Sequence, residues 1–131
     1  MTPPPPGRPL VLIVDDSETN RKLARDVLHV AGFETLEAAS GAEGIALAAE
    51  CLPDVILMDL RLPDMNGTDA ARTLANEAQT ASIPVVALSS LPVEGGGDWL
   101  ERSGFAGWLE KPIQVSEFPK QVRRYCAKAS S

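Results

Sequence analysis

Several kinds of residue and segment are scarce in this 131-residue sequence, and each scarcity excludes a class of protein. There are two cysteines, Cys51 and Cys126, whose wide separation matches no ligand spacing of a structural zinc site. We expect both to be reduced thiols. No apolar run approaches the roughly 20 residues that a membrane-spanning helix needs, and no apolar signal-peptide core follows Met1. These absences predict a cytoplasmic protein without membrane contact.

Basic residues are outnumbered as well. The chain carries 12 Lys and Arg against 18 Asp and Glu, a formal net charge of -6. Because the phosphates of nucleic acid repel an acidic surface, a nucleic-acid partner is not expected. The length suits one domain, expected at 9–128, between a disordered proline-rich leader at 1–8 and a tail at 129–131.

Apolar segments of five or six residues alternate along the chain with segments whose apolar residues recur every three or four positions. The first kind predicts strands buried in a sheet, and the second predicts amphipathic helices. The expected strands are 10–14, 33–38, 55–59, 84–88 and 105–110. The first expected helix is capped by Asp16 or Ser17 and stops at Gly32. The other expected helices run from Ser40 to Cys51, from Thr68 to Ala78 and from Ser116 to Ala127.

This alternation predicts a parallel sheet with helices on both faces and right-handed crossovers. We expect a flavodoxin-like, doubly wound α/β fold with five strands in the order 2-1-3-4-5. The last helix is expected to carry Val115, Phe118, Val122 and Tyr125 on one face. The run Gly95–Gly97 breaks the helical pattern, because each glycine costs about 1 kcal/mol relative to alanine inside a helix. The fourth helix should therefore be short or irregular, and its segment mobile.

Polar residues end four of the five expected strands. Asp15 and Asp16 follow the first, Asp59 ends the third, Ser89 follows the fourth and Lys111 follows the fifth. A lone strand-ending aspartate more often just begins a turn. However, the carboxyl ends of parallel strands meet at one edge of an open sheet, where ligands bind. The coincidence of four such ends favours a binding site.

The chemistry of these residue types narrows the ligand. Two carboxylates 4 Å apart repel by about 4 kcal/mol at an effective dielectric of 20, so the cluster calls for a cation. Oxygen ligands with an open edge suit Mg²⁺, which shares its coordination shell with phosphate. With the Lys111 ammonium and the Ser89 hydroxyl, such a site could hold a phosphoryl group. Asp59, alone on the middle strand, is the candidate nucleophile that would form an aspartyl phosphate.

Five motifs occur along the chain in a recognisable order: Val14-Asp15-Asp16, Met58-Asp59, Leu62-Pro63-Asp64-Met65-Asn66-Gly67, Ala87-Leu88-Ser89 and Lys111-Pro112. Together they resemble the signatures of the response-regulator receiver domain, over roughly residues 10–127. Any one of them alone would mean little, but the set is specific. The segment Leu12–Asn20 is similar to that of single-domain receivers of the DivK type and of receivers attached to hybrid kinases.

The resemblance implies a role for each motif residue. Asp59 would accept a phosphoryl group from a histidine kinase or a phosphotransfer protein. Ser89 would be the switch hydroxyl that bonds this group, and Lys111 would pair with it. The Mg²⁺ ligands would be Asp15, Asp16, Asp59 and the backbone carbonyl of Arg61.

It also implies a signalling domain rather than an enzyme, one that catalyses only its own phosphorylation and dephosphorylation. The chain stops soon after the last expected helix, so we expect no output domain. The signal would then leave by protein–protein contact or onward phosphotransfer, and the sequence does not identify the downstream partner.

Two positions depart from what is usual in the family. Trp108 stands where Tyr, Phe or His is common, and it is either a packing ring or a switch that moves with Ser89. Leu91 flanks the expected phosphorylation pocket with an apolar side chain that would not orient an attacking water. We therefore expect a long-lived phosphoryl group.

Two other functions stay open. A binding module on the same fold that needs no phosphorylation would be favoured if an acidic residue or the lysine were missing, and none is. A phosphohydrolase of the haloacid-dehalogenase kind also uses an aspartate nucleophile, but it needs an acid two residues later, where this chain has Arg61. Dinucleotide binding is disfavoured, since no Gly-x-Gly-x-x-Gly follows the first strand.

Overall fold

The computed structural model describes residues 8–89, 102, 104–111 and 113–129. The predictions for the leader up to residue 7, for Leu91 and for Gly95–Gly97 with its irregular helix lie outside the described residues. Arg8, assigned to the leader, is described, and its Nη1 lies 3.3 Å from Glu34 Oε1. Arg8 therefore contacts the second strand of the sheet.

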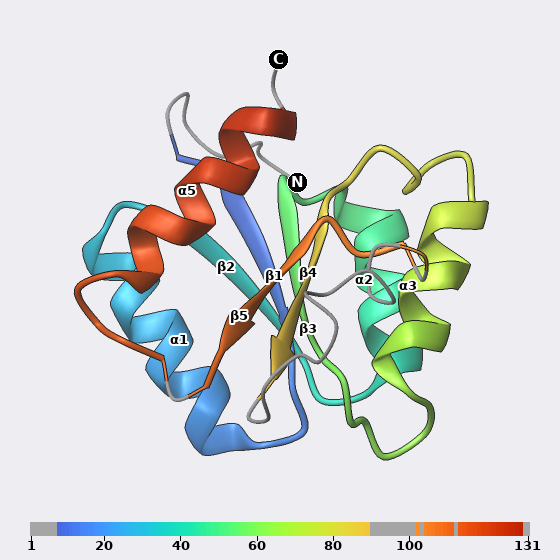
Figure 1. Ribbon diagram of the computed structural model, residues 1–131, viewed down its shortest axis with the longest axis horizontal. Helices are drawn as coiled ribbons and strands as arrows, with labels where there is room; N and C mark the ends of the chain where they lie inside the picture. The colour runs from blue at the N-terminus through green and yellow to red at the C-terminus, as the bar shows by residue number, and fades with distance from the viewer. Residues whose placement is uncertain (1–7, 90–101, 103, 112, 130–131) are drawn as a thin grey trace.

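Five parallel strands form one sheet in the order β2-β1-β3-β4-β5 (Figure 1). This order confirms the expected doubly wound, flavodoxin-like fold. The strands are β1 (Leu10–Val14), β2 (Glu34–Ala38), β3 (Val55–Asp59), β4 (Val85–Ser89) and β5 (Gly107–Glu110).

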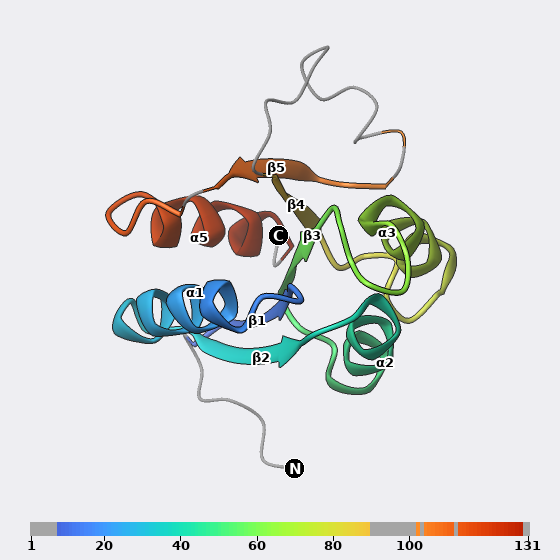
Figure 2. The same cartoon turned by 90° about the horizontal axis from the view of Figure 1, so that it is seen from below.

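Helices cover both faces of the sheet. Figure 2 shows α1 and α5 on one face and α2 and α3 on the other. The expected elements agree with the structure to within two residues at each end. The helices are α1 (Glu18–Val30), α2 (Gly41–Cys51), α3 (Gly67–Asn76) and α5 (Phe118–Ala129).

Alternate residues of the central strands supply two halves of the core. In β1, Val11 and Ile13 belong to the cluster that includes residues of α1 and α5, whereas Leu12 and Val14 belong to the cluster that includes residues of α2 and α3. This follows because successive side chains of a strand point to opposite faces. A strand buried on both faces needs apolar residues throughout, which is why the unbroken apolar runs predicted the centre of the sheet.

The ends of the helices follow local signals. The Ser17 hydroxyl caps α1 by accepting a hydrogen bond from Asn20 N at 3.3 Å, and Ser40 Oγ accepts one from Glu43 N at 3.2 Å at the start of α2. Gly32 follows α1 with a φ of 94°, a left-handed conformation that glycine adopts without strain. These residues set where α1 and α2 begin and where α1 ends.

The end of α3 differs from the prediction. The helix ends at Asn76 rather than Ala78, because Glu77 is extended with φ -94° and ψ 126°. The Thr80 hydroxyl donates to the carbonyl of Leu74 at 2.6 Å, which satisfies one of the last acceptors of the helix.

The start of α5 also differs from the prediction. The helix begins at Phe118 rather than Ser116, three residues after Val115, which is 62% exposed. Phe118 and Val122 are buried, and Tyr125 packs beside them. The buried face therefore begins with Phe118.

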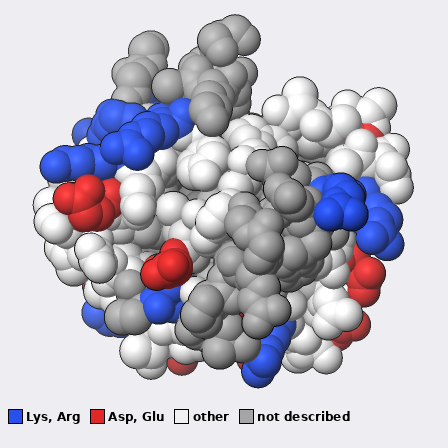
Figure 3. All heavy atoms as spheres, viewed as in Figure 1, with Lys and Arg blue, Asp and Glu red and all other residues white. Residues whose placement is uncertain are grey.

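Charge is unevenly spread over the face drawn in Figure 3. Lys and Arg side chains gather over α5, whose sequence includes Lys120, Arg123 and Arg124. The net charge of -6 therefore coexists with a basic region over this helix.

Neither cysteine forms a disulfide. Cys51 is half-buried and Cys126 is buried, and burial raises the pKa of the Cys126 thiol to about 11. This thiol is therefore protonated at neutral pH. None of the helices in the described part of the chain combines the length and the apolar character that crossing a membrane requires.

Candidate functional site

The sheet register brings the polar strand ends to one edge, where the strand arrows finish in Figure 1. Val14 of β1 pairs with Met58 of β3, which places Asp15 beside Asp59. Asp59 pairs in turn with Leu88 of β4. The central strands of the sheet thus deliver the predicted residues to a common place.

Three carboxylates and one ammonium group meet at this edge. Asp15, Asp16 and Asp59 each offer one carboxylate oxygen, and these oxygens lie within 4.8 Å of one another. Lys111 Nζ donates to Asp15 Oδ2 at 2.9 Å and to Asp59 Oδ2 at 3.1 Å. Asp15 is 1% exposed, Asp59 is half-buried and Asp16 is exposed. The cluster is therefore closed around Asp15 and open at Asp16.

Backbone and side-chain contacts hold Asp15. Its N–H donates to the carbonyl of Ala38 at 3.1 Å, and its Oδ1 accepts from Ser17 N at 2.9 Å. Its carbonyl accepts from Arg21 Nη1 at 2.6 Å. The position of this carboxylate is thus fixed by the fold itself.

The two oxygens of Asp59 have different partners. Oδ1 accepts from Arg61 N at 3.1 Å, and Oδ2 accepts from Lys111. Burial raises the pKa of the Asp59 carboxyl above its ordinary value, and the charge of Asp15 raises it further. The Arg61 hydrogen bond and the Lys111 charge oppose this shift without cancelling it.

The charge of the site is not balanced. Burial acts to lower the pKa of Lys111, but its hydrogen bonds and charge interactions with Asp15 and Asp59 outweigh burial, and the pKa is raised. Lys111 therefore stays positive at neutral pH. One ammonium against three carboxylates leaves two negative charges, which a divalent cation would neutralise.

The loop after Asp59 folds back on itself. Gly67 N donates to the carbonyl of Leu60 at 2.9 Å, and Arg61 forms an antiparallel bridge with Asn66. A side chain at Gly67 would collide with the backbone oxygen of Asp59. Glycine at this position thus allows α3 to begin directly against the segment that carries the carboxylate.

The chemistry of these groups fits Mg²⁺. Hard divalent cations prefer carboxylate, carbonyl and water oxygens, and Mg²⁺ usually keeps open positions for substrate phosphate. Asp15 and Asp59 offer fixed oxygens, and the exposed Asp16 leaves one side accessible. The residues whose carboxylates could hold the ion are Asp15, Asp16 and Asp59.

Comparison with known proteins identifies the family. The response regulator receiver domain matches residues 11–123. This chain belongs to that family. The receiver is a phospho-accepting domain of two-component signalling rather than a classical enzyme, and domains of this kind interact with histidine kinases or partner proteins.

Relatives of this receiver are aligned over nearly their whole length. The polar-differentiation response regulator DivK of Brucella ovis is 35% identical over 119 residues, which cover 91% of this chain and 97% of that one. The solved structure of chemotaxis protein CheY4 of Vibrio cholerae has a TM-score of 0.85 and 29% identity, covering 91% of this chain and 99% of that one.

A second solved structure holds a metal ion. The receiver domain of sensor histidine kinase PA1611 from Pseudomonas aeruginosa PAO1 has a TM-score of 0.83 and 25% identity, and covers 92% of this chain and 99% of that one. In that structure a magnesium ion is coordinated in the active site cleft. The acidic cluster of this receiver provides carboxylate oxygens, a kind of ligand that Mg²⁺ prefers.

Ser89, the expected switch residue, lies at the same edge of the receiver. It ends β4 one residue beyond Leu88, the partner of Asp59, and it is buried. Its carbonyl accepts a hydrogen bond from Lys111 N at 2.7 Å. The backbones of these two residues are therefore tied together beside the carboxylates.

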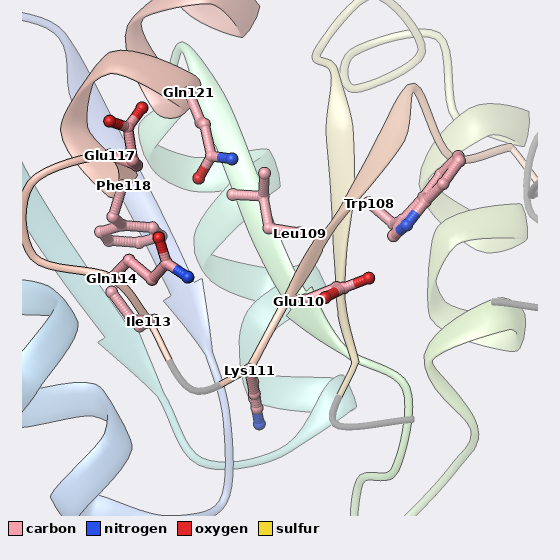
Figure 4. A pocket seen from close by; sticks show the side chains of 9 residues that line it. All are labelled: Trp108, Leu109, Glu110, Lys111, Ile113, Gln114, Glu117, Phe118 and Gln121. Atoms are coloured by element: carbon pink, nitrogen blue, oxygen red, sulfur yellow. The ribbon is translucent and has the colours of Figure 1, made fainter. Parts of the chain in front are cut away.

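Trp108, the other expected switch residue, lies on β5 opposite Ala87. Its half-buried ring packs with the cluster that contains Ala71 and Leu74 of α3. Figure 4 shows the ring on the other side of β5 from Phe118. The indole thus occupies a packed position, and its role as a switch stays a prediction.

A hollow of about 400 Å³ lies between β5 and α5 (Figure 4). Polar side chains such as Gln114, Glu117 and Gln121 line it, and none of the three clustered aspartates does. Lys111 belongs to its rim, but the lysine side chain points away from Gln121 in Figure 4. The hollow and the carboxylate cluster therefore share Lys111 but none of the three aspartates.

The sequence places Asp64 in the motif Leu62–Gly67 but gives no sign of the main contact of its side chain. The carboxylate accepts hydrogen bonds from Gly41 N at 2.8 Å and from Ala42 N at 2.9 Å, at the start of α2. These bonds hold the pKa of the Asp64 carboxyl below its ordinary value. The partners are 23 and 22 residues away in sequence, so no local pattern signals the contact.

Proposed function

We propose that this receiver accepts a phosphoryl group on Asp59 from the phosphohistidine of a histidine kinase or a phosphotransfer protein, in a Mg²⁺-dependent step. One observation carries the proposal: the three carboxylates gather within 4.8 Å, and Lys111 bonds two of them. The Mg²⁺ ligands in this proposal are the carboxylates of Asp15, Asp16 and Asp59 and the carbonyl of Arg61.

The reaction is a transfer between two nucleophiles. A carboxylate oxygen of Asp59 forms a bond to phosphorus while the bond from phosphorus to the histidine nitrogen breaks. That nitrogen keeps the electron pair and takes a proton from solvent. Mg²⁺, when bound, supplies positive charge against the phosphoryl oxygens. Lys111, whose Nζ is 3.1 Å from Asp59 Oδ2, stabilises the same oxygens.

The signal leaves through the neighbouring strands. The Ser89 hydroxyl donates a hydrogen bond to the phosphoryl group in this proposal, and Trp108, opposite Ala87 on the adjacent strand, responds to the change. The output is contact with a partner protein or onward phosphotransfer. We place this exchange in the cytoplasm, where histidine kinases take their phosphoryl group from ATP.

Intact-mass measurement after incubation with acetyl phosphate tests this function. The wild-type chain should gain one phosphoryl group with Mg²⁺ and none with a chelator. Asp59→Asn should abolish the adduct, and the exposed Asp69→Asn should keep it. Absence of any adduct under all donor and metal conditions would contradict the proposal and favour a binding module that needs no phosphorylation.

A further inference from the structure

The Asp64 carboxylate joins two segments that flank the site. Asp64 lies in the loop between β3 and α3, and its two oxygens bond the first two N–H groups of α2. Oδ1 takes Gly41 N and Oδ2 takes Ala42 N. Because each oxygen has its own donor, the carboxylate is held in a single orientation.

This contact completes the cap of α2. The first N–H groups of a helix have no partner within the helix. Here the third is taken by Ser40, and Asp64 takes the first two from outside the element. The positive end of the helix dipole favours a carboxylate at this place. The start of α2 is thus a strong anchor for the loop.

An apolar contact lies beside the polar one. A side chain at Gly41 would collide with the side chain of Met65. Gly41 is buried, and Met65 packs against the core cluster on this side of the sheet. Two consecutive loop residues, Asp64 and Met65, therefore fix the loop to the same point of α2.

The same helix is connected to the other half of the site. It follows β2, whose last residue, Ala38, accepts a hydrogen bond from Asp15 N at 3.1 Å. Asp15 is thus bonded to Ala38, which leads along the chain to the start of α2. The start of α2 is bonded in turn to Asp64, in the loop that also contains Arg61. Arg61 N completes the connection by donating to Asp59 Oδ1.

We propose that Asp64 is a positioning residue. By docking the β3–α3 loop on α2, it sets the place of the Arg61 carbonyl relative to Asp15 and Asp16, and with it the affinity of the site for Mg²⁺. This inference deepens the proposed function and rests on it. Loss of a group that orients a metal ligand commonly weakens metal affinity about 10- to 100-fold. Gly67 also restrains this loop, so we expect a loss of about tenfold.

Two variants separate positioning from simple stabilisation. Asp64→Ala removes both bonds to the start of α2. Ser40→Ala removes one bond from the same helix start and leaves the loop untouched, so it is the matched control. Both should lower the midpoint of urea unfolding. Asp64→Asn keeps one acceptor and replaces Asp64→Ala if that variant does not fold.

Two readouts follow on the full, unphosphorylated chain. Calorimetric titration with MgCl₂ should give a dissociation constant about tenfold higher for Asp64→Ala and unchanged for Ser40→Ala. Amide hydrogen exchange in a chelator needs no metal. Exchange of the Arg61 and Gly67 amides should be faster in Asp64→Ala and unchanged in Ser40→Ala.

The outcomes distinguish this inference from the proposed function. If the two variants bind Mg²⁺ equally well, or if loop exchange in Asp64→Ala matches the wild type, the positioning role is overturned even where Asp59 is phosphorylated. A wild type that binds Mg²⁺ but forms no phosphoryl adduct overturns the proposed function alone. A wild type that binds no Mg²⁺ overturns both.

Discussion

Lys111 Nζ lies 3.1 Å from Asp59 Oδ2, although Lys111 follows β5, Asp59 ends β3, and β4 lies between these two strands in the sheet. The same ammonium reaches Asp15 Oδ2 at 2.9 Å, beyond β3. Lys111 thus extends from the edge of the sheet to its centre. It holds together carboxylates that would otherwise repel, so the charge balance of this cluster governs the following predictions.

Asp59→Asn should raise the stability of the metal-free protein near neutral pH. Burial and the Asp15 charge raise the pKa of this carboxyl in the folded state, so its ionised form is disfavoured there relative to the unfolded chain. Below the unfolded pKa the group is protonated in both states and has no effect. The penalty develops as pH rises from the unfolded pKa through the raised folded pKa, and is complete above it.

Urea unfolding in a chelator measures this effect. The midpoint of Asp59→Asn should exceed that of the wild type near neutral pH, and the difference should shrink as pH falls below the folded pKa. The chelator matters because Mg²⁺ stabilises the wild type by mass action. Asp69→Asn, on the surface of α3, should leave the midpoint unchanged. A lower midpoint for Asp59→Asn at neutral pH would contradict the account.

Lys111→Gln should lower the stability of the metal-free protein and increase its stabilisation by Mg²⁺. Asp15, 1% exposed, would keep a buried charge without its ion-pair partner. Breaking a buried ion pair costs about 3–5 kcal/mol of stability. Because Lys111 and Asp59 are partly exposed, we expect a loss near the lower end of this range. Melting temperatures with and without Mg²⁺ measure both effects.

The exposed pair of Lys22 and Asp26, at 3.1 Å, offers a control for that variant. Lys22→Gln should change the stability by about 0.5 kcal/mol or less. The explanation fails if Mg²⁺ raises the melting temperature of Lys111→Gln no more than that of the wild type.

Gly67→Ala should lower the free energy of unfolding, although replacing glycine by alanine in a helix usually raises it. Replacing glycine by alanine in a helix normally stabilises it by about 0.5–1 kcal/mol. Here the added Cβ collides with the backbone oxygen of Asp59, and the shift that relieves the collision should cost about 1–3 kcal/mol. Urea unfolding gives the sign, with Thr68→Ala one residue further on as the control. A Gly67→Ala variant more stable than the wild type would contradict the predicted collision, because it would show that the Cβ is accommodated beside the Asp59 backbone.

Arg123→Gln should weaken the contact between α5 and the end of α1. Its Nη2 donates to the carbonyl of Ala31 at 2.9 Å, and its guanidinium lies 4.9 Å from the centroid of the Phe33 ring. These interactions together are worth about 1 kcal/mol at a partly exposed site. Lys120→Gln removes the same charge from the same helix, and equal unfolding midpoints for the two variants would refute the specific contact.

The strand-end cluster was predictable because each of its residues lies next to a sequence pattern that marks a strand. Asp15, Asp59 and Lys111 each follow a short apolar run, and the rule that parallel strands end at one edge then brings them together. The structure shows the distances that the rule cannot give. The start of α1 was equally predictable, since Ser17 caps it by a bond to a residue three positions away.

The contact of Asp64 was not predictable in this way. A turn-forming aspartate has the same sequence pattern whether it faces solvent or a distant helix, and its partners here are decided by the packing of α2 beside the loop. The late start of α5 has a different, local cause. The carbonyl of Gln114 accepts a hydrogen bond from Phe118 N at 2.8 Å, and this turn, which contains the exposed Val115, precedes the helix.

Chemical identification of the modified residue tests the central claim most directly. Borohydride reduces an aspartyl phosphate to homoserine, which peptide mass spectrometry can locate. After treatment with acetyl phosphate and Mg²⁺, we predict homoserine at position 59 and at no other aspartate, and none when a chelator replaces Mg²⁺. Homoserine at another position, or equal amounts with and without Mg²⁺, would contradict the assignment of Asp59 as a metal-dependent phosphoryl acceptor.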